Sequence, residues 1–159
     1  MKCPSCGKDM RATRKDYRYE ESGLENVMLK DITVYECKCG ETLPEIPSVK
    51  RLHGQIADDL INKQGPLTGE EFRFLRKGMR TSAKELAQLL GVTTVTLSRW
   101  ENNKEKVGPQ SDRLLRYIYL TRSKGLVASQ VAKRLEGIMV GIVDRKPPKA
   151  VPIFIRPAA

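Results

Sequence analysis

The stretch SAKELAQLLGVTTVTLSRWENN, residues 82–103, decides the fold of the second half of the chain. It opens with the Ser-x-x-Glu pattern of a capping box, and apolar residues follow at helical spacing. Gly91 ends this helix, and Thr93 is placed to cap a second helix that buries Leu97 and Trp100. Two short helices joined by a turn that contains glycine predict a helix-turn-helix.

Burial of Leu97 and Trp100 turns the other side of the second helix outward, where it can enter the major groove of duplex DNA. On this side Arg99 can form a bidentate hydrogen bond with guanine, and Val95 can contact a thymine methyl group. Helix N-termini and nearby polar or basic side chains suit the phosphates. The expected DNA-binding residues are Ser82, Thr93, Thr94, Val95, Ser98, Arg99, Lys104 and Lys106. The alternative is a small helical bundle with a solvated basic face.

A helix is expected on each side of this motif. Thr68 and Glu71 have the spacing of a capping box, and an apolar stripe follows them. Gly108 and Pro109 begin a helix after the motif, because proline is favourable at the first helical position.

The C-terminal part follows a break at Lys124-Gly125. Apolar residues step by about one helical turn through residues 126–143, which predicts a further helix. It should either add a dimer contact or fold back on its own domain. The last residues, 144–159, are rich in proline and should be extended or disordered.

Charge is distributed unevenly over the 159 residues. The first 65 residues hold eleven basic and eleven acidic residues of the chain's 29 and 19, so the whole net charge of +10 lies from Pro66 onward. A basic second half predicts a polyanionic partner. No apolar run is long enough to cross a bilayer and no signal-peptide core follows Met1, so we expect a cytoplasmic protein without a membrane partner.

Four cysteines lie in two pairs. Cys3 and Cys6 form a C-x-x-C pair, and Cys37 and Cys39 form a C-x-C pair that is one residue shorter. In a reducing cytoplasm, paired cysteines hold metal more often than they form disulfides. We predict one zinc ion per chain, bound by all four thiolates and structural because no coordination position stays open. A disulfide and free thiols are the alternatives, and His53 is expected at the surface rather than among the ligands.

The residues around these cysteines predict a small β module. Apolar residues alternate along Val27–Val34 as in half-buried strands. Such a sheet has little core of its own, so a structural metal is a suitable staple. A helix with Ser48 as its cap follows, and Gly65-Pro66 stops it. The sequence outside the cysteine pairs shows no nucleophile–base pair and no glycine-rich phosphate loop, so no enzyme activity is expected.

The segment from Phe72 to Leu120 resembles the Xre/Cro type of helix-turn-helix, and the pieces that match are LAQLLGV and LSRWENN. The resemblance implies that an arginine of the first helix, Arg76, pairs with the glutamate that ends the recognition helix, Glu101. It further implies that this ion pair is structural and does not contact DNA.

The N-terminal segments MKCPSCG, YEESGLENVMLKDI, YECKCGE and IPSVKRLHGQIA resemble the zinc-binding half of YgiT/MqsA-type antitoxins. Together the two resemblances cover about residues 1–122. They imply the antitoxin of a bacterial type II toxin–antitoxin pair, whose zinc domain neutralises a ribonuclease toxin and whose helix-turn-helix dimer represses its own operon. The family normally has C-x-x-C in the second pair, so Cys39 is matched only as the nearest thiol.

We therefore expect an α+β chain. A zinc-stapled β module with its helix should occupy residues 1–65, an all-α Xre-type domain residues 66–124, and a helical extension with a proline-rich tail residues 125–159. A homodimer should bind a palindromic operator with half-sites one helical turn apart. The alternatives to an antitoxin-repressor are a stand-alone transcription regulator and a regulator that senses metal or oxidation through its zinc module.

Overall fold

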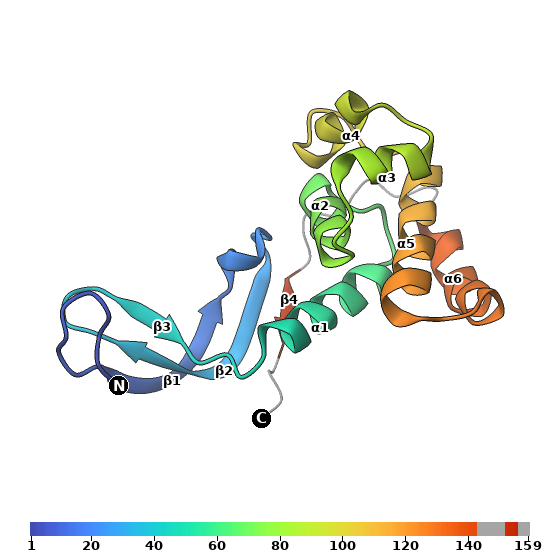
Figure 1. Ribbon diagram of the computed structural model, residues 1–159. Helices are drawn as coiled ribbons and strands as arrows, with labels where there is room; N and C mark the ends of the chain where they lie inside the picture. Colours follow the sequence, from blue (N-terminus) through green and yellow to red (C-terminus); the bar gives the residue numbers. More distant parts are fainter. Residues whose placement is uncertain (143–151, 156–159) are drawn as a thin grey trace. The chain divides into compact units, whose positions relative to one another are not determined.

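The computed structural model describes residues 1–142 and 152–155 (Figure 1). The chain divides into two compact units, which are Met1–Ile56 together with Pro152–Ala159, and Ala57–Val151. We call them the cysteine-bearing unit and the helical unit. The mixed α+β architecture predicted from the sequence is confirmed, because a small sheet is followed by helices. Among the described residues, none of the helices has the length and apolar character that crossing a membrane requires.

A small sheet forms the cysteine-bearing unit. Strand β1 (Arg11–Arg18) pairs antiparallel with β2 (Val27–Glu36), and the short 3-10 helix η1 (Glu20–Ser22) lies between them. Strand β3 (Thr42–Pro44) pairs antiparallel with the end of β2. Strand β4 (Ile153–Ile155) pairs parallel with the start of β2.

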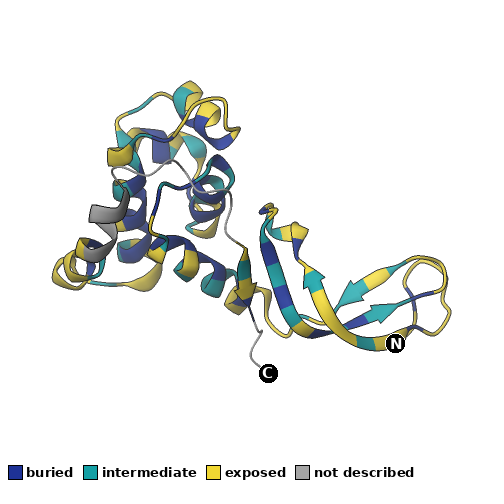
Figure 2. Cartoon of the chain, turned by 180° about the vertical axis from the view of Figure 1, so that it is seen from behind, coloured by how far each residue is buried: buried dark blue, intermediate teal, exposed yellow. Residues whose placement is uncertain are grey.

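A β-bulge explains the change of phase in the apolar pattern of β2. Lys15 lies opposite Ile32 and Tyr17 lies opposite Leu29, so β2 has one residue more than β1 in this interval. Asp31 within it has a positive φ of 51°. The extra residue places the apolar residues before and after the bulge on one buried face. Buried and partly buried residues alternate along β2 on either side of it (Figure 2).

Two details of this unit differ from the sequence-based expectations or extend them. His53 is half-buried rather than at the surface, and its Nε2 lies 3.0 Å from the Tyr19 hydroxyl oxygen. Burial of the ring lowers the pKa of His53. In the proline-rich stretch, Ile153–Ile155 are extended and form β4. Apart from Pro152, the other residues of 144–159 lie outside the described residues.

Helix α1 (Val49–Asn62) begins in the cysteine-bearing unit and ends in the helical unit. Leu52, Ile56 and Leu60 are buried and recur at helical spacing, whereas Val49 in the first turn is 48% exposed. The two compact units meet in sequence inside this helix, after Ile56. The predicted domain boundary lies later, at Gly65, where the helix has ended.

The helical unit contains five further helices in the described residues: α2 (Gly69–Gly78), α3 (Ala83–Leu90), α4 (Thr94–Glu101), α5 (Pro109–Lys124) and α6 (Ala128–Ile142). Their buried residues lie on the sides that face one another (Figure 2). Helix α6 packs on α5 of its own chain, and its Val131 and Leu135 are buried. Of the two arrangements expected for this helix, a dimer contact and folding back on its own domain, the structure shows the second.

The caps of these helices follow the sequence closely. Thr68 Oγ1 accepts a hydrogen bond from the Glu71 amide, and Glu71 accepts one from the Thr68 amide, which completes the predicted capping box. Ser82 also accepts from the amide three residues on. Its expected partner Glu85, however, binds Arg122 of α5 at 2.7 Å, so its carboxylate joins α3 to α5.

A buried ion pair joins α5 to the connection between α1 and α2. The Arg116 and Asp112 side chains are both 0% exposed, and Arg116 Nε donates to Asp112 Oδ1 at 2.7 Å. Asp112 Oδ2 accepts a hydrogen bond from the Leu67 amide at 2.6 Å. The other guanidinium nitrogens donate to the carbonyl oxygens of Ile61, Lys63 and Gly65. This pair therefore forms hydrogen bonds with backbone groups at the end of α1 and in the connection that follows it.

Gly69 lies where the start of α2 meets the end of α4. Its amide donates a hydrogen bond to Asn103 Oδ1 at 2.8 Å. A Cβ atom at Gly69 would lie 2.1 Å from the Trp100 carbonyl oxygen, far inside contact distance. The close approach of the two backbones therefore requires glycine at this position.

Gly69→Ala should lower the free energy of unfolding by about 1–3 kcal/mol, because α2 must move away from α4. Chemical denaturation followed by circular dichroism measures this change. Gly78→Ala, at the other end of α2, is the matched control, since its Cβ would lie 3.6 Å from the Tyr119 ring, an ordinary contact. Equal stability of the two variants would show that the close approach of α2 and α4 is not needed.

Candidate metal centre and nucleic-acid interface

Two turns carry the four cysteines. Cys3 and Cys6 lie before β1, in a turn that the Gly7 amide closes by donating to the Cys3 carbonyl at 2.9 Å. Cys37 and Cys39 lie between β2 and β3, in a turn that the Gly40 amide closes in the same way at 3.0 Å. Both glycines have positive φ, 71° and 95°, which residues with a Cβ rarely adopt. The glycine after each pair thus lets its turn close.

The two turns bring all four sulfur atoms together. The four Sγ atoms lie within 4.8 Å of one another. Cys3 Sγ is 3.6 Å from Cys39 Sγ, and Cys6 Sγ is 3.4 Å from Cys37 Sγ. A disulfide needs about 2.05 Å, so these are four thiols in one cluster. The shortened C-x-C pair therefore still places Cys39 among the others, and the four residues could hold one metal ion.

The four thiols affect one another's ionisation. The Lys8 amide lowers the pKa of Cys6, but the hydrogen bonds that Cys6 shares with Cys37 and Cys39 outweigh it and raise that pKa to about 12. Ionising more than one of the four thiols is unfavourable because their negative charges would lie close together. A divalent cation held by the four sulfur atoms would offset this cost and would favour their thiolate forms.

Little apolar core surrounds the cluster. Cys3, Cys37 and Met10 are buried together, with Tyr35 and Leu43 packed against them. Cys6 and Cys39 are exposed. Because this end of the sheet buries so few side chains, cross-linking by a metal would supply a large part of its stability.

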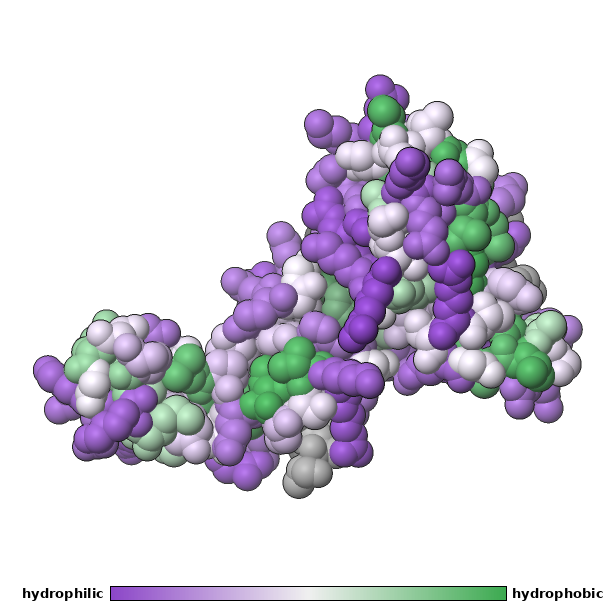
Figure 3. Space-filling model, viewed as in Figure 1, coloured by the Kyte–Doolittle hydropathy of each residue, from purple (hydrophilic) through white to green (hydrophobic). Residues whose placement is uncertain are grey.

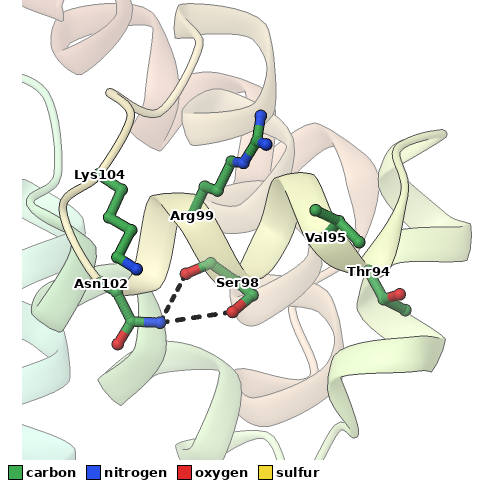
Figure 4. A pocket seen from close by; sticks show the side chains of 6 residues that line it. All are labelled: Thr94, Val95, Ser98, Arg99, Asn102 and Lys104. Carbon is green, nitrogen blue, oxygen red and sulfur yellow. Dashed lines mark hydrogen bonds between the residues drawn. The ribbon is translucent and has the colours of Figure 1, made fainter.

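The helix-turn-helix consists of α3, a turn at Gly91 and α4. Gly91 has a φ of 67° and caps α3 in the left-handed conformation. Leu97 and Trp100 of α4 are buried, which turns the other side of the helix outward. The outward side lines a hollow of about 360 Å³ (Figure 4). Its lining residues are Thr94, Val95, Ser98, Arg99, Asn102 and Lys104.

Five of the eight residues predicted to bind DNA therefore gather in one place, and three do not line the hollow. Ser82 and Thr93 are the caps of α3 and α4, and each hydroxyl accepts a hydrogen bond from a helix amide. Lys106 is exposed on the loop after α4. These three positions suit contacts with a phosphate backbone rather than with base edges. Hydrophilic side chains cover most of the visible face of the helical unit (Figure 3).

Asn102 is a residue of this surface that the sequence analysis missed. Its Nδ2 donates to the Ser98 carbonyl at 2.8 Å and lies 3.4 Å from the Ser98 hydroxyl oxygen (Figure 4). Arg73 of α2 donates to Asn102 Oδ1 at 2.7 Å, which fixes the orientation of the amide. The spacing of four residues from Ser98 was the signal that could have found it, because such residues share a helix face.

The ion pair between Arg76 and Glu101 lies beneath this surface. Arg76 Nε and Nη2 donate to the two Glu101 oxygens at 2.6 Å and 2.9 Å, and the Glu101 side chain is 7% exposed. The hydrogen bond with Glu101 raises the pKa of Arg76. Arg76 also donates to the Thr81 carbonyl at 3.1 Å. The pair thus joins α2 to the end of α4 and holds the outward helix in place.

Comparison with known protein families gives a match to this chain. A search of curated proteins gives no match. The family described as the antitoxin component of a bacterial toxin–antitoxin system, MqsA, matches residues 1–126, which include the cysteine cluster, the helix-turn-helix and helix α5. Since this match spans most of the 159 residues, the chain belongs to the MqsA antitoxin family.

Proposed function

We propose that this antitoxin is a sequence-specific DNA-binding repressor of its own operon and that it neutralises a ribonuclease toxin. The observation that carries DNA binding is the exposed side of α4, where Arg99, Ser98 and Val95 line one hollow above a buried ion pair. A short helix held in this way and presented beside basic residues suits the major groove. The excess of positive charge from Pro66 onward favours a polyanionic partner.

Each residue has a proposed role in this complex. Arg99 reads guanine through two hydrogen bonds, and Val95, which is 60% exposed, contacts a thymine methyl group. Thr94 and Ser98 complete the base-reading side. Ser82, Thr93, Lys104 and Lys106 contact phosphates and set the register. A homodimer on a palindromic operator in the bacterial cytoplasm is the assembly we propose, and no catalytic step is part of it.

Zinc is the metal that we propose for the cluster. With Zn–S bonds of about 2.3 Å, the sulfur atoms of a tetrahedral site lie about 3.8 Å apart. The distances of 3.6 Å between Cys3 and Cys39 and 3.4 Å between Cys6 and Cys37 are close to this value. Four thiolates fill the coordination sphere, so the zinc would be structural and would support the surface that binds the toxin.

Replacing Arg99 by alanine should weaken specific DNA binding by about 1–3 kcal/mol and relax the preference for one base. Lys104→Ala is the matched control, because it lines the same hollow but is proposed to contact phosphate. It should weaken binding to all sequences alike and reduce the salt slope by about 1. Titration of duplexes selected from a random library, at several salt concentrations, measures both. Unchanged selectivity of Arg99→Ala would mean that α4 does not meet the bases as proposed.

The antitoxin role is tested separately with the gene beside this one. If that neighbour encodes a ribonuclease toxin, its expression alone should arrest growth, and co-expression of this chain should restore it. The two proteins should also purify as a complex. Growth arrest that persists with both proteins present would count against neutralisation, whatever the outcome of the DNA experiment.

A regulator that senses oxidation is the second candidate, and the exposure of Cys6 and Cys39 favours it. Oxidation of these thiolates would release the metal and loosen the module. Operator affinity that stays constant on treatment with peroxide or a chelator would rule out this role and leave the structural one.

A further inference from the structure

The two edges of β2 are paired differently. Along one edge β1 pairs with it from Met28 to Glu36. Along the other, β3 pairs only with Val34–Glu36 and β4 only with Val27–Leu29. Without β4, the start of β2 would present unpaired backbone groups on this side. Such an edge accepts an added strand from another segment.

The side chains of β4 match this edge. Ile153 lies opposite Val27 and Ile155 lies opposite Leu29, so the two isoleucines stand on the face that β2 buries. Val27 and Leu29 are 0% exposed, and Ile155 is 5% exposed. The Ile153 amide donates to the Asn26 carbonyl at 2.8 Å. The edge therefore selects an extended segment with two apolar side chains that are two residues apart.

The middle residue of β4 contributes differently. Phe154 points to the opposite face of the sheet and is 59% exposed. The Lys30 ammonium lies 4.7 Å from the centre of its ring, a cation–π contact at an exposed position. This position therefore constrains the added strand less than the two isoleucines do.

We propose that the Val27–Leu29 edge is a strand-addition site, which residues 153–155 of the same chain occupy and from which an extended partner segment must displace them. The ladder is only three residues long, so it can open without unfolding the sheet. The family match ends at residue 126, so this occupant lies outside the part of the chain that matches the family. The proposal concerns the cysteine-bearing unit and is independent of DNA binding.

Two release variants of the full-length chain test whether β4 occupies the edge. Ile153→Pro removes the amide that donates to Asn26, and Ile155→Asp places a carboxylate at a buried position. Phe154→Ala changes an exposed residue of the same strand and is the control. Amide hydrogen exchange in residues 27–29 should be about tenfold faster in both release variants than in the wild type and the control. Equal exchange in all four proteins would overturn the proposal.

A synthetic peptide of residues 150–159 tests whether the edge accepts a strand in trans. The peptide is used at about 1 mM, which is comparable to the effective concentration that a short linker gives to an attached segment. At this concentration the peptide should shift the NMR signals of residues 27–29 in the release variants and leave those of the wild type unchanged. Shifts in none of the proteins, or equal shifts in all, would overturn the proposal. Protection that increases with protein concentration would show that a second copy supplies the strand, and it would overturn the intramolecular assignment.

Discussion

Cys37→Ser should abolish metal binding and unfold the end of the cysteine-bearing unit that carries the four cysteines, while the helical unit stays folded. Cys37 is buried in the turn between β2 and β3 and lies 3.4 Å from Cys6. Its loss leaves three thiolates and opens the site to water. In small zinc modules the free energy of metal binding, about 10–16 kcal/mol, is largely the free energy of folding. The cluster has too little apolar core to replace this contribution.

Metal analysis and two-dimensional NMR measure this outcome. The wild type should contain one zinc per reduced chain and Cys37→Ser almost none, with collapsed signals only for residues of the cysteine-bearing unit. Ser5→Ala is the matched control, since Ser5 lies between Cys3 and Cys6 but only donates to Glu41 at the surface. A Cys37→Ser protein that retains full zinc content would refute the site.

Cys39→Ser tests the shortened pair in particular. Because Cys39 Sγ lies 3.6 Å from Cys3 Sγ, we expect the same loss of zinc as for Cys37→Ser. Since Cys39 is exposed, the variant removes a ligand without emptying a buried position. Retention of one zinc by this variant alone would mean that water or another group takes the fourth position.

Arg116→Leu should destabilise the helical unit by about 3–5 kcal/mol, the second large effect that the structure predicts. The substitution leaves the Asp112 carboxylate buried without its cation, and the side chains of both residues are 0% exposed in the wild type. It also removes a donor from each of three carbonyl groups, at the end of α1 and in the connection to α2. Buried polar groups that lose their partners carry the full cost of desolvation.

Arg122→Leu is the matched control in the same helix. Arg122 pairs with Glu85 at 2.7 Å, but both side chains are 45% exposed, so its loss should change the free energy of unfolding by less than about 1 kcal/mol. Chemical denaturation of both variants, with the slope of each transition compared, separates a loss of stability from a change in the unfolded state. Similar midpoints for the two variants would refute a special role for the buried pair.

Most of the local structure could be predicted from the sequence. The caps Thr68, Ser82 and Thr93 begin α2, α3 and α4 because a side-chain oxygen satisfies an amide only a few residues away. The burial of Leu97 and Trp100 followed from helical periodicity in the same way. The family resemblance seen in the sequence is confirmed by the match over residues 1–126.

The gathering of chemical groups from distant segments could be predicted only in part. The two cysteine pairs indicated one site because thiols have few other roles at that spacing. That the C-x-C turn brings Cys39 within 3.6 Å of Cys3 depends on the antiparallel pairing of β1 with β2, which places Arg11 opposite Glu36. The spacing of Asn102 from Ser98 indicates its place on this surface, but the orientation of its amide depends on Arg73, which lies in another helix.

The sequence by itself determined the helices, their caps, the outward side of α4 and the spacing within each cysteine pair, because each of these depends on neighbours in the chain. Only the tertiary structure decided that Arg116 binds the carbonyls of Ile61, Lys63 and Gly65, and that Ile153–Ile155 pair with Val27–Leu29. No local pattern specifies these partners. A buried guanidinium or an open strand edge takes whichever backbone groups the path of the chain brings within hydrogen-bond distance.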